Sequence, residues 1–571
     1  MLRFLALSLT MICLLCAPQP GRAENAFVQR KVVALYDSSY FDNVRHLLVH
    51  RLFEMPANWL GLDVRYHDVQ TGFPELGDET LGVIIAFESE PKIDIPSYIN
   101  WLHHWVVKKG KRLVLAESIG IENTNTLEDA SLQKLKEVYA RIGMRDMQVW
   151  HPLTHKSIIL YKDPQMVDFE RTLSPPLSTF QEMRITLEGT SHLKVAVSPE
   201  HPEQYADLVI TGPQGGYVAY GYAYHEQDLQ DHYVTAWYLN PFAFLRKSLI
   251  GNQHFPIPDV TTRNGRRIFY SHIDGDGWNN LSLIEHYHDT LASSADVIEN
   301  EILRAYPDFG FSVGLVAGDV VNSCFGSDKS RETARRIYAL PNVEPTSHTY
   351  THPLYWEFFE HYTEEKEKPY IRAFPQRAGM FSQDFSSLLT RETKEENFNM
   401  DGGHTHNSLR RQEKPRHEMT EKEKLKELYD VPRSYNCVPF DEEKEINEAK
   451  AIIEALTPEG KKVELLQWSG NTSPYEGFIR KVREAGMLNI NGGESRFDNE
   501  YPSYSSLYPI GIRVGKELQI YSTASNENTY TNLWSERFFG YRYLIETVRH
   551  TEDPIRSMSI SIAIPASALP A

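Results

Sequence analysis

The chain has 571 residues, which is too long for a single hydrophobic core, so we expect two or three domains. Hydrophobic residues make up 41% of it and aromatic residues 12%, as in an ordinary folded protein with a well-filled interior. The formal net charge of -18 argues against a nucleic-acid partner, because general nucleic-acid binders present a basic patch. Such a charge would suit a cationic ligand, but most acidic proteins are simply soluble.

Residues 1–23 have the pattern of a secretory signal peptide. Arg3 precedes an apolar segment over residues 4–17, and Gly21 and Ala23 are small residues that suit cleavage after Ala23. The alternative is an uncleaved anchor, for which the apolar segment is short. No other stretch is long enough to cross a bilayer. We therefore expect an exported protein, periplasmic or secreted, without a stable membrane span after signal removal.

The chain has four cysteines, which limits its disulfide and metal chemistry. Cys13 and Cys16 lie in the predicted signal, which leaves Cys324 and Cys437 in the mature protein. These two could form a disulfide in an oxidising compartment if their geometry permits it. A zinc site made of four cysteines is excluded by the count.

Residues 28–162 alternate between strand and helix patterns. Helices are expected over 44–52 and 96–108, and buried strands over 32–36, 62–66, 81–86 and 113–116. This alternation predicts a doubly wound α/β domain with a mostly parallel sheet, of the flavodoxin or amidotransferase type. The segment lacks a cysteine nucleophile and a glycine-rich phosphate loop, and Ser118 lacks the glycines of a nucleophile elbow. We expect a structural or binding role rather than a catalytic one.

Residues 163–260 predict a β-rich connector. Two apolar runs, 208–211 and 217–222, flank a glycine-rich turn and indicate a hairpin. Four tyrosines gather in and after the second run, namely Tyr217, Tyr220, Tyr222 and Tyr224. They would suit stacking on a sugar, but tyrosine is also a common strand residue, and the strand interpretation is the one we favour.

The strongest functional signal lies in two motifs beyond residue 266. Asp274 and Asp276 end an apolar run and, two positions apart, point to the same side of an extended strand. His348 and His352 follow what we expect to be another strand end. Two imidazoles and one carboxylate are a common ligand set for catalytic zinc. The remaining carboxylate would then be free to act as a base.

A charged insertion over about 364–430 interrupts this region. Its histidines, His404, His406 and His417, could bind metal, but surface histidines in a charged loop usually do not. Beyond it, apolar strands are expected at 464–468, 487–490 and 518–521. In α/β barrels the carboxyl ends of the strands carry the site, so we expect these ends to line the same cleft as Asp274 and His348.

These motifs resemble those of polysaccharide deacetylases, the NodB-homology family of esterases. The chain is most similar to the deacetylase region of PelA-type proteins, which process the Pel exopolysaccharide. The matching segments are residues 272–277 (HIDGDG), 347–353 (SHTYTHP), 468–470, 489–493 and 526–534. They occur in the family's order, and the resemblance covers about residues 266–555.

The resemblance implies a distorted (β/α) barrel over residues 266–571, in which Asp276, His348 and His352 bind a divalent metal, zinc, and Asp274 is the catalytic base. It implies N-deacetylation of an exported N-acetylhexosamine polysaccharide, Pel-like and rich in N-acetylgalactosamine, in the biosynthesis of a biofilm exopolysaccharide. The implied partners are the acetylated polymer and other exopolysaccharide export components. Four further residues are candidates for substrate contacts: Trp278, Trp468, Asn491 and Glu527. The two tryptophans could equally be buried barrel aromatics.

The chain departs from the family near its C-terminal end. Relatives carry a histidine, the family's general acid, on a strand after the stretch that corresponds to Thr551–Pro554, whereas this chain has no histidine after His550. We hypothesise that the last barrel strand is incomplete and that activity is weakened or lost; the tail over 565–571 looks like a frameshift or a divergent end. His550 is a candidate for a substitute acid. The alternatives are a deacetylase of another N-acetylhexosamine polymer, and a catalytically impaired polysaccharide-binding or assembly protein.

Overall fold

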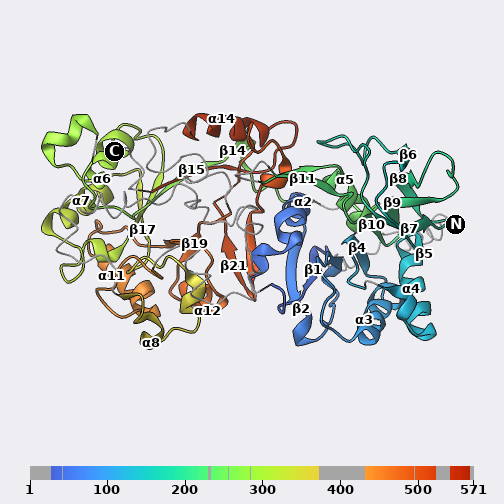
Figure 1. Cartoon of the computed structure of the whole chain (residues 1–571). Coiled ribbons are helices and arrows are strands. Elements are labelled where there is room, and N and C mark those ends of the chain that lie inside the picture. The colour runs from blue at the N-terminus through green and yellow to red at the C-terminus, as the bar shows by residue number, and fades with distance from the viewer. Residues whose placement is uncertain are drawn as a thin grey trace, which may run out of the picture.

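The computed structural model describes residues 28–565, apart from 42, 122, 229–232, 255, 283, 372–430, 494 and 523–539. The predicted signal peptide, most of the charged insertion and Glu527 lie outside the described residues. The fold is α/β, with two lobes that are each built on their own sheet (Figure 1). Within the described ranges, no helix has both the length and the apolar character needed to span a bilayer.

The first lobe begins with four parallel strands, as the sequence predicts. They are β1 (Lys31–Tyr36), β2 (Asp63–Asp68), β3 (Thr80–Ile85) and β4 (Arg112–Glu117). Every residue of β3 is buried, because helices cover both faces of a parallel sheet. The helices of this part are α2 (Glu54–Trp59), α3 (Ile95–Leu102), which continues as the π-helix η4 (His103–Lys108), and α4 (Asp129–Arg141).

The predicted connector continues the same sheet. Its strands β8 (Thr190–Ala196), β9 (Tyr205–Gly212) and β10 (Gly215–Ala219), with β6 (Ile158–Lys162) from the end of the first predicted segment, extend the sheet to the order β2-β1-β3-β4-β10-β9-β8-β6. Strand β10 pairs in parallel with β4 and antiparallel with β9, which confirms the predicted hairpin. One hydrophobic core contains residues from Val32 to Ile250, together with Tyr504, Leu507 and Met558, so the two predicted segments share one sheet and one core.

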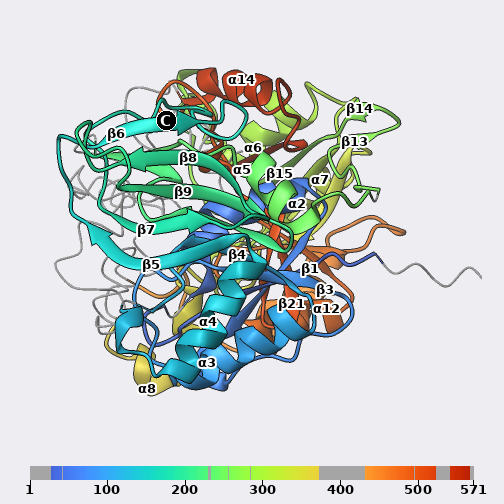
Figure 2. The same cartoon turned by 90° about the vertical axis from the view of Figure 1, so that its right-hand side faces the viewer.

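Two shorter antiparallel pairs complete the first lobe. Strands β5 (Met144–His151) and β7 (Phe180–Ile185) form one pair and lie beside β9 (Figure 2). Strands β11 (Tyr224–Asp228) and β12 (Tyr233–Trp237) form the other, followed by α5 (Pro241–Leu245). The β5–β7 pair lies over one end of the main sheet and leaves a cavity there, described below.

The second lobe is built on a curled parallel sheet in the order β19-β18-β17-β16-β15-β22. Its strands are β15 (Phe269–Asp274), β16 (Phe311–Leu315), β17 (Val343–Ser347), β18 (Leu465–Gln467), β19 (Leu488–Ile490) and β22 (Ile560–Pro565). Its helices include α6 (Ser294–Ile298), α7 (Asp328–Tyr338), α8 (Glu364–Glu367), α11 (Ala449–Glu454), α12 (Glu476–Glu484) and α14 (Gly540–His550). This half-barrel is consistent with a distorted barrel domain.

Two expectations about strands in this lobe are corrected. Strand β22 pairs in parallel with β15 over six residues, from Phe269 opposite Ile560 to Asp274 opposite Pro565. The hypothesis of an incomplete last strand is therefore wrong, since the strand forms although it carries no histidine. The strand expected over 518–521 is β21 (Glu517–Ile520), but it pairs antiparallel with β20 (Gly511–Val514), outside the parallel sheet.

Cys324 and Cys437 form a disulfide, with their Cα atoms 5.2 Å apart. The bond joins the loop after β16 to the segment that follows the charged insertion. Disulfides of this kind persist in oxidising compartments, so the bond agrees with the expected export.

Candidate metal centre

The candidate site lies at the carboxyl edge of the parallel sheet in the second lobe. Asp274 is the last residue of β15, Asp276 follows two residues later, and His348 comes directly after β17. The carboxyl ends of parallel strands meet at one edge of a sheet, which brings side chains distant in sequence together. The predicted clustering of the two motifs is confirmed.

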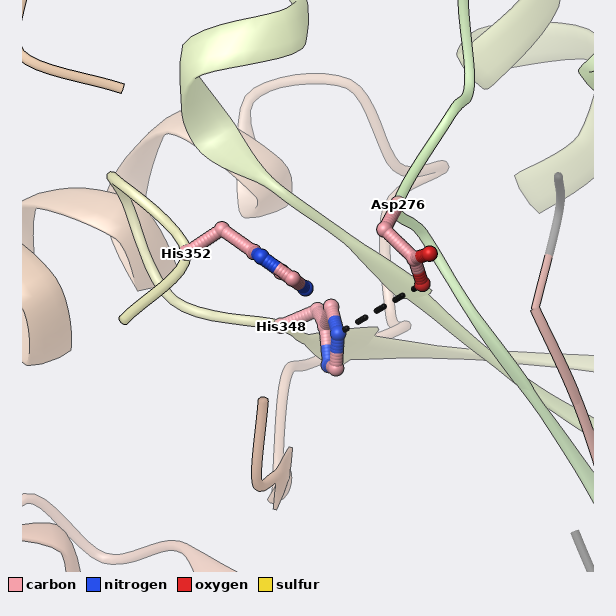
Figure 3. A group of neighbouring side chains, drawn as sticks. All are labelled: Asp276, His348 and His352. Carbon is pink, nitrogen blue, oxygen red and sulfur yellow. Dashed lines mark ion pairs between the residues drawn. The ribbon is translucent and has the colours of Figure 1, made fainter. Parts of the chain in front are cut away.

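Asp276, His348 and His352 converge on one point (Figure 3). One ligand atom from each residue lies within 4.8 Å of the others, and the Nε2 atom of His348 is 3.9 Å from Oδ1 of Asp276. Both histidines are buried, whereas 32% of the Asp276 side chain is exposed. The cluster is therefore closed on the protein side and open to solvent beside Asp276.

The hydrogen bonds around the histidines prepare them as ligands. The Nδ1 atom of His348 lies 3.1 Å from the backbone carbonyl of Gln467 and donates to it, which leaves Nε2 unprotonated. The Nδ1 atom of His352 lies 2.8 Å from the hydroxyl of Ser434. Burial lowers the pKa of both imidazoles, so they are neutral, the form that binds metals. This donor set fits a divalent metal ion.

The loop between the two histidines is held in a strained shape by Glu445. Thr349 and His352 have φ angles of 71° and 55°, in the left-handed region that side chains other than glycine rarely adopt. The buried carboxylate of Glu445 accepts hydrogen bonds from the N–H groups of Tyr350 (2.7 Å) and Thr351 (2.9 Å) and from the Thr351 hydroxyl. Strain of this kind persists only where the surroundings fix it.

Asp274 lies beside the cluster but has a different environment from Asp276. The side-chain amide of Asn491 donates to its Oδ2 at 2.9 Å, while no described group hydrogen-bonds its Oδ1, which lies 3.8 Å from Nδ1 of His348. Burial, and after it the Asp276 carboxylate, raise the pKa of Asp274 well above its usual range. A buried carboxyl with one free oxygen beside the cluster is placed to accept a proton there.

Asn491 acts through Asp274 rather than at the surface of a cleft. It is buried, and its amide also donates to the backbone carbonyl of Trp468 at 2.9 Å. The side-chain oxygen of Asn491, Oδ1, accepts a hydrogen bond from the N–H of Gly492 at 3.0 Å. The structure thus places Asn491 in the interior, in direct contact with Asp274.

Trp278 and Trp468 do not offer a face to a ligand. Both are 0% exposed within the core of the second lobe. The indole N–H of Trp468 donates to Asn489 at 3.0 Å, and its ring packs edge-on against Trp356. The structure therefore supports the interpretation of both tryptophans as buried barrel aromatics rather than as substrate contacts.

The structure places His550 away from the site, at the end of α14. Its Nδ1 donates to the backbone carbonyl of Phe497 at 3.0 Å. Arg267, just before β15, donates to Val548 and Thr551, so this end of α14 lies at the amino end of β15. Asp274 is at the other end of that strand, about 20 Å away at about 3.3 Å per residue. His550 therefore lies at the opposite end of β15 from Asp274.

Two further buried groups near the cluster were not predicted. Asp319, after β16, accepts from the hydroxyl of Tyr435 at 3.0 Å and from Asn279 at 3.1 Å, and burial raises its pKa to about 7. Burial lowers the pKa of His272 to about 4, and its Nε2 lies 3.9 Å from Asp274. Asp319 could have been found by a signal like that used for Asp274, a polar residue soon after an apolar strand, whereas His272 lies inside β15.

No protein-family model matches this chain, and a search of the curated proteins finds no match either. What the chain does must therefore be inferred from its own residues, their geometry and the resemblance of its motifs.

Proposed function

We propose that the chain is a metal-dependent N-deacetylase of an exported N-acetylhexosamine polysaccharide. The observation that carries the proposal is the position of Asp274, a buried carboxyl with one free oxygen, beside the cluster of Asp276, His348 and His352. The order and spacing of the motifs support the same class of reaction, and the half-barrel supports the distorted (β/α) barrel that this class would use.

In the proposed reaction, Asp276, His348 and His352 would hold zinc, which as a Lewis acid would polarise the acetamide carbonyl. Asp274 takes the proton of the attacking water, because its raised pKa favours the protonated form. Asn491 keeps Oδ2 in place and so directs Oδ1 to the proton. When the bond between the carbonyl carbon and nitrogen breaks, Asp274 returns this proton to the leaving amine. One carboxyl then serves as base and acid, with acetate and a free amine as products.

The polymer we propose is Pel-like and rich in N-acetylgalactosamine, on the strength of the motif resemblance. The signal-like N-terminus and the Cys324–Cys437 disulfide support action outside the cytoplasm, periplasmic or secreted, together with other export components. Chitin-like chains and peptidoglycan are the rival polymers. Comparing acetate release across the three polymers separates them.

The test is acetate release from N-acetylgalactosamine oligomers by zinc-loaded and metal-stripped protein. We expect release only with zinc, and a loss of about 100-fold or more in Asp274→Asn, which removes the base but not a metal ligand. His348→Ala should lose zinc itself. The matched control is Asp308→Asn, an exposed aspartate before β16, which should match the wild type. Release that is independent of metal, or unchanged in Asp274→Asn, would refute the proposal.

A second candidate is a catalytically impaired protein that binds the polymer. The observation in its favour is that β22 carries no histidine where the family has its acid. A folded, zinc-containing chain that binds the oligomers but releases no acetate would establish this candidate instead.

A further inference from the structure

The first lobe contains a cavity of about 350 Å³ at the carboxyl ends of β4 and β10. The β5–β7 pair covers it from one side, through Trp150, Phe180 and Met183, and α4 contributes Tyr139. Its volume is within the range of small-molecule sites, which is about 300 to 1,000 Å³. Nothing in the proposed deacetylation uses it.

The carboxyl of Glu117 lines this cavity in an unusual way. Glu117 is the last residue of β4 and has a φ of 69°, in the left-handed region that a glutamate rarely adopts. Only 8% of the residue is exposed. Its Oε2 accepts from the N–H of Gly221 at 3.1 Å, whereas Oε1 has no hydrogen-bond partner among the described residues. A strained residue with an unpaired buried oxygen points to a ligand, because a purely structural carboxyl would have both oxygens satisfied.

The charge around Glu117 selects the kind of ligand. No lysine, arginine or histidine is among the described residues that line the cavity. Burial, and to a smaller extent the nearby carboxyls of Glu88 and Glu226, raise the pKa of Glu117 to about 8. One of these two neighbours, Glu226, is paired with Arg51 at 3.8 Å. An anionic ligand would be repelled here, while a cation would relieve the cost of ionising Glu117.

The walls of the cavity are aromatic. Tyr139, Phe180 and Tyr217 line its interior and are buried. Trp150 and Tyr220 also line it but are 54% and 62% exposed, so they stand where it opens to solvent. Aromatic faces attract ammonium groups and pack against apolar ring surfaces. Tyr217 and Tyr220 are two of the four tyrosines that gather in and after the apolar run 217–222.

We propose that this cavity is a second binding site, which takes one amino-sugar unit in its ammonium form. Glu117 pairs with the ammonium group, and Trp150 and Tyr220 pack against the sugar ring at the mouth. The source of such units rests on the proposed function, since removal of acetyl groups creates them along the polymer. The binding itself does not depend on the metal centre.

The test is calorimetric titration of the full chain with a galactosamine trimer, the N-acetylgalactosamine trimer and galactose. Asp274→Asn protein is used throughout, so that no acetyl group is removed during the titration. We expect the amine trimer to bind at least tenfold more tightly than the other two. Glu117→Gln should abolish this preference, and Trp150→Ala should weaken binding of the amine trimer about tenfold.

The matched control is Leu153→Ala, which removes an exposed apolar side chain near Trp150 that does not line the cavity, and it should bind as the parent does. Equal affinity for the free and acetylated trimers, or amine binding unaffected by both cavity variants, would overturn the proposal. Because the amine is supplied ready-made, such a failure leaves the deacetylase proposal intact. Conversely, binding of the amine trimer by a wild-type chain that releases no acetate would refute only the deacetylase proposal.

Discussion

Replacing Glu445 by alanine should destabilise the second lobe and weaken the metal centre together. The carboxylate is fully buried and accepts from two backbone amides, those of Tyr350 and Thr351, between the two histidine ligands. Each buried donor left without a partner costs about 1–3 kcal/mol, so the two amides together cost about 2–6 kcal/mol. The left-handed φ angles of Thr349 and His352 would then no longer be imposed, and the imidazoles should separate.

Two measurements test this reasoning. Urea denaturation of metal-stripped protein gives the change in the free energy of unfolding, and competition with a chromogenic chelator gives the zinc affinity. Glu445→Gln, which keeps one acceptor oxygen, should fall between the wild type and Glu445→Ala in both. Glu448→Ala is the control, since Glu448 is partly exposed in the same helical segment and pairs with Lys444 at 3.8 Å. It should change stability by less than about 1 kcal/mol.

A Glu445→Ala protein with wild-type stability would refute the claim that this carboxylate stabilises the loop by accepting hydrogen bonds from its backbone N–H groups. Lowered stability with wild-type zinc affinity would refute the claim that the loop positions the ligands.

Three further predictions concern other parts of the chain. Replacing both Cys324 and Cys437 by serine should lower the free energy of unfolding by about 3–5 kcal/mol, because the disulfide closes a loop that spans 113 positions. Urea denaturation without reductant measures this change, and an unchanged midpoint would contradict the prediction. The pKa of Glu117 in the folded chain, about 8, lies above its ordinary value of 4.5, so the folded state binds more protons than the unfolded state and its stability falls as pH rises between these values. Glu117→Gln should therefore gain stability over the wild type progressively from about pH 5 to about pH 8 and hold that gain above it, whereas a difference independent of pH would count against the burial argument. Asn491→Ala should lower kcat for acetate release about tenfold at unchanged zinc content, as expected for the loss of one hydrogen bond to Asp274, and an unaltered kcat would show that Asn491 does not position the base.

The strands and the metal cluster could be predicted from the sequence because both leave local signals. A buried parallel strand is usually a short apolar run, and in this chain the run before Asp274 is followed at once by polar residues, whereas the strand before His348, Val343–Ser347, is itself largely polar. Since parallel strands end at a common edge, the pattern also predicts that these side chains meet. Asp319 carries a weaker version of the same signal, with three residues between it and the end of β16.

Other features depend on pairings between distant segments, which periodicity does not show. The pairing of β10 with β4 merges the connector into the first sheet, although 212–216 indicate only a local hairpin. Whether Trp278 and Trp468 pack inside or face a cleft depends on neighbours such as Trp356, which come from other strands and loops. The position of His550 likewise follows from the hydrogen bonds of its neighbours Val548 and Thr551 with Arg267, beyond the amino end of β15.

The pairing of β22 with β15 has a consequence for the order in which the molecule can be completed. Phe269 pairs with Ile560, so Asp276, His348 and His352 are all synthesised long before one neighbour of β15 exists. Until then β15 has an open edge, which invites pairing with other chains. Contacts between such distant segments also form slowly, because a long loop must close first. A chain interrupted before residue 560 would hold every candidate ligand, yet the strand that carries Asp274 would be bordered on one side only.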